Sequence, residues 1–148
     1  MQLPEANQPL SQPEKWLAFK AFFILQTFNL AIRLRGFRPL YQRLLRASRA
    51  RALSAAGLTP QQVKRLGGVV GVANHRIRLL HVACLPESLT TWWLLRRRGV
   101  DAQMWLGVRK VDQSLTGHAW VEYQGRVISG DPELTVNTTR FMLPSDGA

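Results

Sequence analysis

The sequence contains a single cysteine among its 148 residues. One cysteine excludes an intramolecular disulfide framework and a zinc site built from several cysteines. A secretory signal is also lacking, because the first fifteen residues are polar and contain Pro4, Pro9 and Pro13. A free thiol persists in a reducing compartment, so these absences together predict a cytoplasmic protein.

No hydrophobic run in the sequence has the length of a membrane span. The most apolar run covers residues 21–32, contains Gln26 and Asn29, and is flanked by Lys20 and Arg33. A spanning helix needs about 20 mainly apolar residues. We therefore expect a soluble chain that is not inserted in a membrane, and the sequence leaves association with a membrane surface open.

Acidic residues are scarce, with 9 Asp+Glu against 20 Lys+Arg and a net charge of +11. This balance favours an anionic partner. The charge alone does not decide whether that partner is nucleic acid, an acidic protein or peptide, or a membrane surface. The basic residues are spread along the chain, without the compact run of like charges that marks a tail. A phosphate-binding loop is absent too, because no Lys-Ser/Thr follows Gly67-Gly68, and we predict no cofactor.

The length favours one domain with a sizeable core, and a hydrophobic fraction of 46% is ordinary for a globular chain. We predict a flexible Pro- and Gln-rich arm over residues 1–13 and a single domain over residues 14–148. Within this domain we expect a helical part over residues 14–80 and a catalytic core over residues 81–135.

Helical patterns precede strand patterns. The sequence predicts helices over residues 13–34, 39–50 and 60–66, with Gly67-Gly68 breaking or bending the third before an apolar segment that also favours helix. The apolar residues of the first helix cover more of its surface than one stripe, which predicts contacts on two of its sides.

A further helix is expected to start at Pro86, with Glu87 in the same turn, and to end at Gly99. Its last turn contains Arg96, Arg97 and Arg98, which complement the negative end of a helix. This capping role explains the three arginines without a nucleic-acid site.

Beyond the central helix the hydrophobic period changes to two. Strands are predicted over residues 104–109, 118–123 and 126–131, with a polar connection over residues 112–117 and a turn at Gln124-Gly125. The tail from residue 133 is weakly patterned. Helices followed by a small antiparallel sheet predict an α+β fold.

The only cysteine, Cys84, stands at the expected start of the central helix, where a helix end stabilises negative charge. If Gln124-Gly125 forms a two-residue turn, the hairpin register places His118 opposite Asp131. Directly opposed residues have Cβ atoms about 4.5–5.5 Å apart, within reach of a carboxylate and an imidazole. The other face of the hairpin suits a core, with Ala119, Val121, Tyr123 and Ile128.

These three residue types predict nucleophilic catalysis by a thiol. Cys84 would be the nucleophile, His118 would take its proton and later protonate a leaving amine, and Asp131 would orient the imidazole. Each residue alone is more often structural, and a lone cysteine is usually a small buried apolar residue. The joint pattern favours catalysis over these separate roles.

Two other readings remain open. His75 and His81 lie on the approach to Cys84 and are competing histidines, but a metal site built from the three would need a fourth ligand that the sequence does not show. The net charge and five tryptophans would also suit a basic nucleic-acid-binding protein without enzymatic activity.

Several segments resemble the lasso-peptide biosynthesis B proteins, which are transglutaminase-like cysteine peptidases related in fold to papain-like enzymes. The resemblance is strongest over residues 75–131. The segments that carry it are Cys84-Leu85-Pro86-Glu87-Ser88-Leu89, Leu94-Leu95-Arg96-Arg97-Arg98-Gly99-Val100, Leu106-Gly107-Val108-Arg109 and His118-Ala119-Trp120-Val121-Glu122. The first and last of these segments at this separation are fairly specific, whereas either alone would be weak.

The resemblance implies a Cys84-His118-Asp131 triad that removes the leader from a ribosomally made precursor peptide. A separate, asparagine-synthetase-like cyclase that uses ATP would then close the ring. Because a helix is expected from residue 13, the resemblance implies the split form of the family, in which a separate recognition protein delivers the leader. Glu87 departs from the basic residue of many members, which puts substrate contacts there in doubt.

Overall fold

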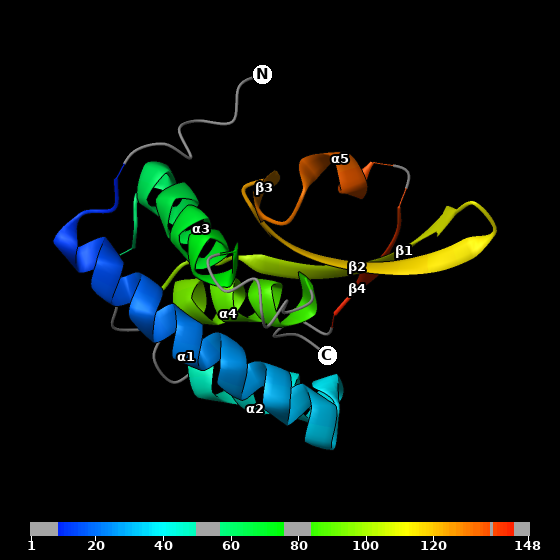
Figure 1. Cartoon of the computed structure of the whole chain (residues 1–148), viewed down its shortest axis with the longest axis horizontal. Helices are drawn as coiled ribbons and strands as arrows, with labels where there is room; N and C mark the ends of the chain where they lie inside the picture. The colour runs from blue at the N-terminus through cyan, green and yellow to red at the C-terminus, as the bar shows by residue number, and fades with distance from the viewer. Residues whose placement is uncertain (1–8, 50–56, 76–83, 137, 144–148) are drawn as a thin grey trace.

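A computed structural model describes residues 9–49, 57–75, 84–136 and 138–143. Four helices lie on one side of the molecule: α1 (Gln12–Arg35), α2 (Phe37–Arg49), α3 (Pro60–His75) and α4 (Cys84–Arg96). An antiparallel sheet in the order β3-β2-β1-β4 is formed by β1 (Gln103–Val111), β2 (Ser114–Tyr123), β3 (Arg126–Ser129) and β4 (Thr139–Met142). A short helix, α5 (Pro132–Thr135), lies across the sheet from α4 (Figure 1). This arrangement confirms the predicted α+β fold.

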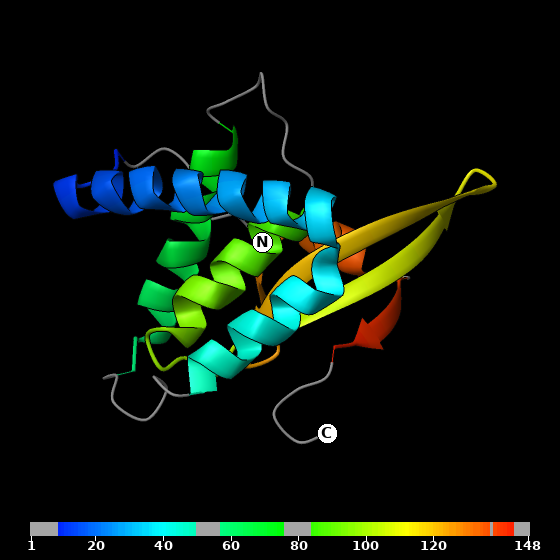
Figure 2. The same ribbon diagram turned by 90° about the horizontal axis from the view of Figure 1, so that it is seen from below.

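Helix α4 is the centre of the core because it is buried on nearly all sides. A helix of this kind belongs inside a domain, where other elements surround it. The helices α1, α2 and α3 pack against α4 from outside, and β2 packs against it from the sheet (Figure 2). Its buried residues are Pro86, Ser88, Leu89, Thr90, Thr91, Trp92, Leu94 and Leu95.

The C-terminal end of α4 confirms the capping role of its arginines. Arg98 donates a hydrogen bond to the carbonyl of Leu94 at 2.9 Å. Arg96 forms an ion pair with Asp101 at 3.1 Å. Gly99 then has φ of +75°, which glycine adopts without steric cost.

Helix α3 is continuous, so the predicted break at Gly67-Gly68 is wrong. Gly67 is buried, and a Cβ atom there would collide with the carbonyl oxygen and the Cγ2 atom of Ile128 in β3. Gly68 is exposed and has no neighbour within the same range. Gly67 therefore allows α3 to approach the sheet closely, a role that the sequence pattern does not show.

Two tight turns join the three consecutive strands. Gln124 and Gly125 have φ of +51° and +74°, and this confirms the predicted two-residue turn between β2 and β3. Asp112 and Gln113 have φ of +45° and +74° and form a second turn of this kind. Because β2 already begins at Ser114, the predicted polar connection over residues 112–117 is wrong.

A β-bulge changes the register of the β2–β3 hairpin. Glu122 pairs with Val127 as predicted, but Val121 pairs with Ser129, so Ile128 is the extra residue. Strand β3 then ends at Ser129. The predicted pairing of His118 with Asp131 in one ladder is therefore wrong.

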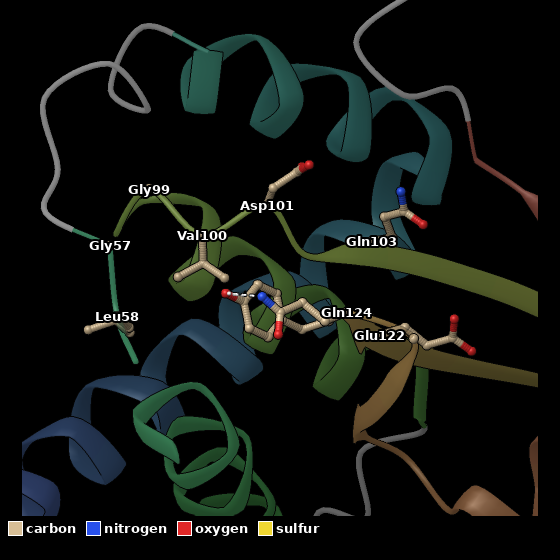
Figure 3. A pocket seen from close by; sticks show the side chains of 10 residues that line it. Gly57, Leu58, Gly99, Val100, Asp101, Gln103, Glu122 and Gln124 are labelled. Atoms are coloured by element: carbon tan, nitrogen blue, oxygen red, sulfur yellow. Dashed lines mark hydrogen bonds between the residues drawn. The ribbon is translucent and has the colours of Figure 1, made fainter. Parts of the chain in front are cut away.

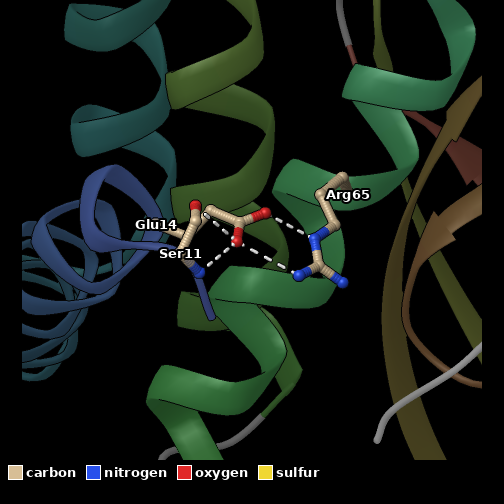
Figure 4. Close-up of polar contacts among 3 residues, drawn as sticks. All are labelled: Ser11, Glu14 and Arg65. Atoms are coloured by element: carbon tan, nitrogen blue, oxygen red, sulfur yellow. Dashed lines mark hydrogen bonds and ion pairs between the residues drawn. The ribbon is translucent and has the colours of Figure 1, made fainter. Parts of the chain in front are cut away.

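The first helix begins at Gln12, one residue before its predicted start. The Ser11 backbone N–H and hydroxyl both donate hydrogen bonds to the Glu14 carboxylate, at 2.7 and 2.8 Å. Arg65 of α3 binds the same carboxylate through two nitrogens (Figure 4). These contacts attach the start of α1 to α3.

Candidate active site

Cys84 is the first residue of α4, two positions before the predicted helix start at Pro86. Its thiol is free and half-buried, and its side chain packs against the hydrophobic core. The first N–H groups of a helix have no partners within the helix and can receive a developing negative charge. Cys84 thus has the position that a thiol nucleophile requires, at the positive end of a buried helix.

His118 lies on β2, where it pairs with Gly107 of β1. The side chain is half-buried, and its ring stacks on Trp120 with a centroid separation of 5.9 Å. The Nε2 atom is buried and has no hydrogen-bond partner in the part of the chain that the structure describes. This nitrogen is therefore not engaged by another group within the described residues, and its burial separates it from solvent.

The environment of His118 favours the neutral imidazole. Burial lowers the pKa of His118, because it penalises the charged ring. The negative charge of Asp131 raises this pKa, the positive charge of Arg109 lowers it, and the negative charge of Glu87 raises it. A neutral imidazole can accept a proton at neutral pH, which is the state that a general base needs.

Asp131 is exposed and forms the N-cap of α5. Its Oδ1 atom accepts a hydrogen bond from the backbone N–H of Glu133 at 2.9 Å. Within the described ranges no hydrogen bond joins Asp131 to His118, although the aspartate charge raises the pKa of the imidazole. The carboxylate therefore acts on His118 through its charge in this structure.

The first turn of α4 is within electrostatic range of the imidazole of His118. Glu87 lies in the first turn of α4, three residues after Cys84, and its charge raises the pKa of His118. A side-chain amide of Asn74 at the end of α3 donates a hydrogen bond to this carboxylate. Among the residues described, Cys84 and His118 share no hydrogen bond with each other. The sequence pattern placed Glu87 in the first turn of the expected helix. It did not indicate that the charge of Glu87 raises the pKa of His118.

A polar network holds the ring on which His118 stacks. The Nε1–H of Trp120 donates to Glu122 at 2.9 Å, and Arg140 of β4 donates to the same carboxylate at 3.1 Å. Arg140 also lies over the ring of Trp120, at 5.6 Å from its centroid. The alternation of β2 puts His118, Trp120 and Glu122 on one face, so the His-Ala-Trp-Val-Glu pattern contained the signal for this network.

The opposite face of the hairpin contributes to the core, as predicted. Ala119 and Val121 are buried in it, and Tyr123 and Ile128 are partly buried against it. Because side chains alternate along a strand, His118 lies on the face that α5 covers. Helix α4 packs on the other, core face of the sheet, and Glu87 in its first turn is near enough for its charge to raise the pKa of His118.

The competing histidines gain no support as ligands. The Nδ1 atom of His75 lies 3.1 Å from the carbonyl oxygen of Gly71 in its own helix, and its side chain is exposed. His81 lies outside the described residues. Over the described ranges no group of three His, Cys, Asp or Glu side chains could hold a metal ion.

An open hollow of about 580 Å³ lies at the other end of α4. It is bordered by Leu58, Val100, Asp101, Glu122 and Gln124 among others (Figure 3). A helix of 13 residues is about 20 Å long, so the hollow is far from Cys84. Its lining residues include no cysteine or histidine, and Glu122 is the residue that it shares with the network around Trp120.

Comparison with known families identifies the fold. A family model described as the transglutaminase-like superfamily matches residues 24–142, a range that includes Cys84, His118 and Asp131. Neither a search of curated proteins nor a search of solved structures found a match. The matched superfamily includes cysteine peptidases. The chain therefore belongs to the transglutaminase-like superfamily.

Proposed function

We propose that this protein is a cysteine endopeptidase that removes the leader from a ribosomally synthesised lasso-peptide precursor. The observation that carries the proposal is the Nε2 of His118, which has no hydrogen-bond partner among the described residues, on a strand that packs against the helix beginning with Cys84. The family match supports the thiol chemistry. The resemblance of the Cys84 and His118 segments to lasso-peptide B proteins supports the substrate.

The proposed reaction has two steps. The Sγ of Cys84 attacks the carbonyl carbon at the end of the leader while His118 takes the thiol proton. The tetrahedral intermediate then breaks the peptide bond, the core amine leaves with the proton from His118, and the leader stays on Cys84 as a thioester. Water activated by His118 hydrolyses this thioester, and Asp131 stabilises the imidazolium through its charge.

The proposal includes partners. A separate recognition protein would deliver the leader, and an asparagine-synthetase-like cyclase would join the freed core amine to an acidic side chain. The protein would work in the cytoplasm, where its single thiol stays reduced. No cofactor is required for the peptidase step itself.

The test is mass spectrometry of a candidate precursor incubated with this protein and the recognition protein. We expect wild-type protein to release leader and core, and we expect Cys84→Ala and His118→Ala to abolish release while circular dichroism stays unchanged. His75→Ala is the matched control and should cleave normally, because the exposed His75 is near the Gly71 carbonyl of its own helix. Full activity of a folded Cys84→Ala variant would refute the proposal.

The nucleic-acid alternative rests on charge alone. Aromatic rings that stack on bases must be exposed, whereas Trp92 and Trp120 are buried and Trp93 and Trp105 are half-buried. Only Trp16 of the five is largely exposed. Tight, strongly salt-dependent binding to DNA or RNA together with absence of cleavage would favour this alternative.

A further inference from the structure

Helix α1 has two apolar faces, and only one of them is covered. Ala21, Leu25 and Phe28 are buried against the other helices, so the predicted contact on two sides is confirmed for one side only. The second face is open. Its side chains form what we call the outer ridge, with exposed fractions of 64% for Trp16, 56% for Phe19, 54% for Phe23, 58% for Leu30 and 73% for Leu34.

The outer ridge is narrow, and Gln26 and Thr27 interrupt it between Phe23 and Leu30. At 3.6 residues per turn its five residues fall within a sector of about 60°, opposite the buried face, and extend over about 27 Å of helix. The rings of Trp16 and Phe19 meet edge to face at 5.9 Å, and those of Phe19 and Phe23 at 4.9 Å. Figures 1 and 2 show α1 on the outside of the helical layer, away from the sheet.

Basic residues flank this ridge. Helical geometry puts Lys15 and Arg33 at about 80° to one side of it and Lys20 at about 60° to the other. All three side chains are exposed. The only acidic residue of α1, Glu14, is bound by Ser11 and Arg65. An apolar strip between cations is the pattern of a helix that lies in a membrane interface.

The charge of the whole chain is concentrated around the same helix. Residues 15–86 contain 13 basic residues and no acidic residue, whereas the remaining residues contain 7 basic and 9 acidic residues. The positive excess therefore belongs to the segment that contains α1, α2 and α3, of which Arg51, Arg76 and Arg78 lie outside the described residues. Positive charge of this kind attracts anionic lipid. A second copy of the chain would bring like charges together along the ridge.

Among the described residues α1 is also the one helix long and apolar enough to cross a membrane, so the expectation from the shorter run of residues 21–32 does not hold for the whole helix. In the structure its inner face is occupied by the packing on α3 and α4 and by the Glu14–Arg65 ion pair. Crossing would expose these polar contacts to lipid. Lying in the plane of the interface keeps them and covers only the outer ridge.

We propose that the outer ridge of α1 binds the surface of a membrane that contains anionic lipid. The aromatic and leucine side chains enter the boundary between headgroups and acyl chains. Lys15, Lys20 and Arg33 contact the lipid phosphates. The ridge lies apart from Cys84 in the sequence and on the outer side of α1, so this binding does not depend on the proposed peptidase activity.

The test is flotation of the full chain with vesicles of phosphatidylcholine alone and of phosphatidylcholine with phosphatidylglycerol. We expect binding to the anionic vesicles at least tenfold tighter than to the neutral ones. The variant Phe19→Gln/Phe23→Gln/Leu30→Gln should lose at least tenfold in binding. Its control, Leu115→Gln/Val136→Gln/Phe141→Gln, removes three equally exposed apolar side chains elsewhere and should bind normally.

A charge variant separates lipid electrostatics from apolar contact. Lys15→Gln/Arg33→Gln should weaken binding to the anionic vesicles several-fold, while the control Lys110→Gln/Arg126→Gln should not. Cys84→Ala should bind as tightly as wild type, so failure of the peptidase proposal leaves this test intact. Equal binding by the ridge variant, or no preference for anionic lipid, would overturn the proposal. Self-association that requires the ridge and excludes vesicles would also overturn it, since the occupant would then be a second copy.

Discussion

At the scale of the residue, His118 is the best-defined member of the candidate site. Burial keeps its imidazole neutral, and Nε2 has no partner among the described residues. Two carboxylates act on it from different elements, Glu87 at the start of α4 and Asp131 at the start of α5. The ring can therefore accept a proton and then be stabilised as a cation.

The titration of His118 tests this electrostatic account. We expect a midpoint below the ordinary histidine value of about 6.5, because burial lowers the pKa of His118. Asp131→Asn should lower the midpoint further and Arg109→Gln should raise it, since the two charges act in opposite directions. The measurement is NMR of the imidazole resonances against pH, with Asp101→Asn as the control that leaves the midpoint unchanged.

The lowered pKa of His118 determines in which direction the free energy of unfolding changes with pH. Because the folded pKa of His118 is lowered, the unfolded chain binds its proton first as the pH falls. The contribution of His118 to the free energy of unfolding is therefore retained above about pH 6.5 and lost as the pH falls from there to the folded value. A His118→Gln variant should lack this part of the acid sensitivity in urea titrations.

Two substitutions of Asp131 distinguish the effect of its negative charge on His118 from its structural role as the N-cap of α5. Asn and Asp are about equally good N-cap residues, so Asp131→Asn should keep the cap on Glu133 and the stability of the fold. Precursor cleavage should nevertheless fall, because the imidazolium loses a nearby negative charge. Asp131→Ala should in addition lose about 0.5–2 kcal/mol in urea unfolding. Unchanged cleavage by Asp131→Asn would remove Asp131 from the triad.

At the scale of the element, the close contact between α3 and β3 falls at the β-bulge. Ile128, the extra residue of the bulge, is also the residue that a side chain on Gly67 would strike. The hairpin pattern was sufficient to predict the turn and the inner pairs of the ladder. The bulge contacts a helix more than fifty positions earlier, which register arguments within the hairpin do not consider.

Two adjacent glycines test this contact. Gly67→Ala should destabilise the protein by about 1–3 kcal/mol, because α3 or β3 must move to admit the methyl group. Gly68→Ala meets open space in the same helix and should be neutral or stabilising by up to about 1 kcal/mol. Urea unfolding of the two variants makes the comparison, and equal effects would contradict the close approach.

The junction of α1 and α3 should respond to acid. Hydrogen bonds from Arg65 and Ser11 hold the pKa of Glu14 at about 2, below its ordinary value of 4.5. Its lowered folded pKa means that this stabilisation is present above pH 4.5 and is lost as the pH falls toward 2. Glu14→Gln should therefore cost about 1 kcal/mol or less at pH 7, as for ion pairs near the surface, and less at pH 2, where about half of the folded carboxylates are protonated. A deficit as large at pH 2 as at pH 7 in urea unfolding would contradict this account.

At the scale of the whole molecule, most of the architecture was predictable from residue patterns. Proline, acidic first turns and glycine stops indicated the helices, and the change to a period of two indicated the sheet. Strand β4 and helix α5 were missed because they are only four residues each and the tail is weakly patterned. The second apolar face of α1 was read as buried, because hydrophobicity does not say which face has a neighbour.

The residue types of the candidate site were predictable from the sequence, whereas their arrangement in space was less so. Cys84 at a helix start and His118 on a strand followed from local pattern. The ladder pair of His118 with Asp131 did not hold, because the bulge ends β3 at Ser129. The charge of Asp131 still reaches the imidazole from the cap of α5, a position that no strand pattern could indicate.

The most direct test of the central claim is intact-mass spectrometry of the protein after rapid acid quenching of its reaction with precursor and recognition protein. Cys84 as nucleophile predicts a transient species heavier by the mass of the leader less one water. Peptide mapping should place this thioester on Cys84, and hydroxylamine should remove it. Cleavage of the precursor by a folded Cys84→Ala variant, without any covalent species, would contradict the account.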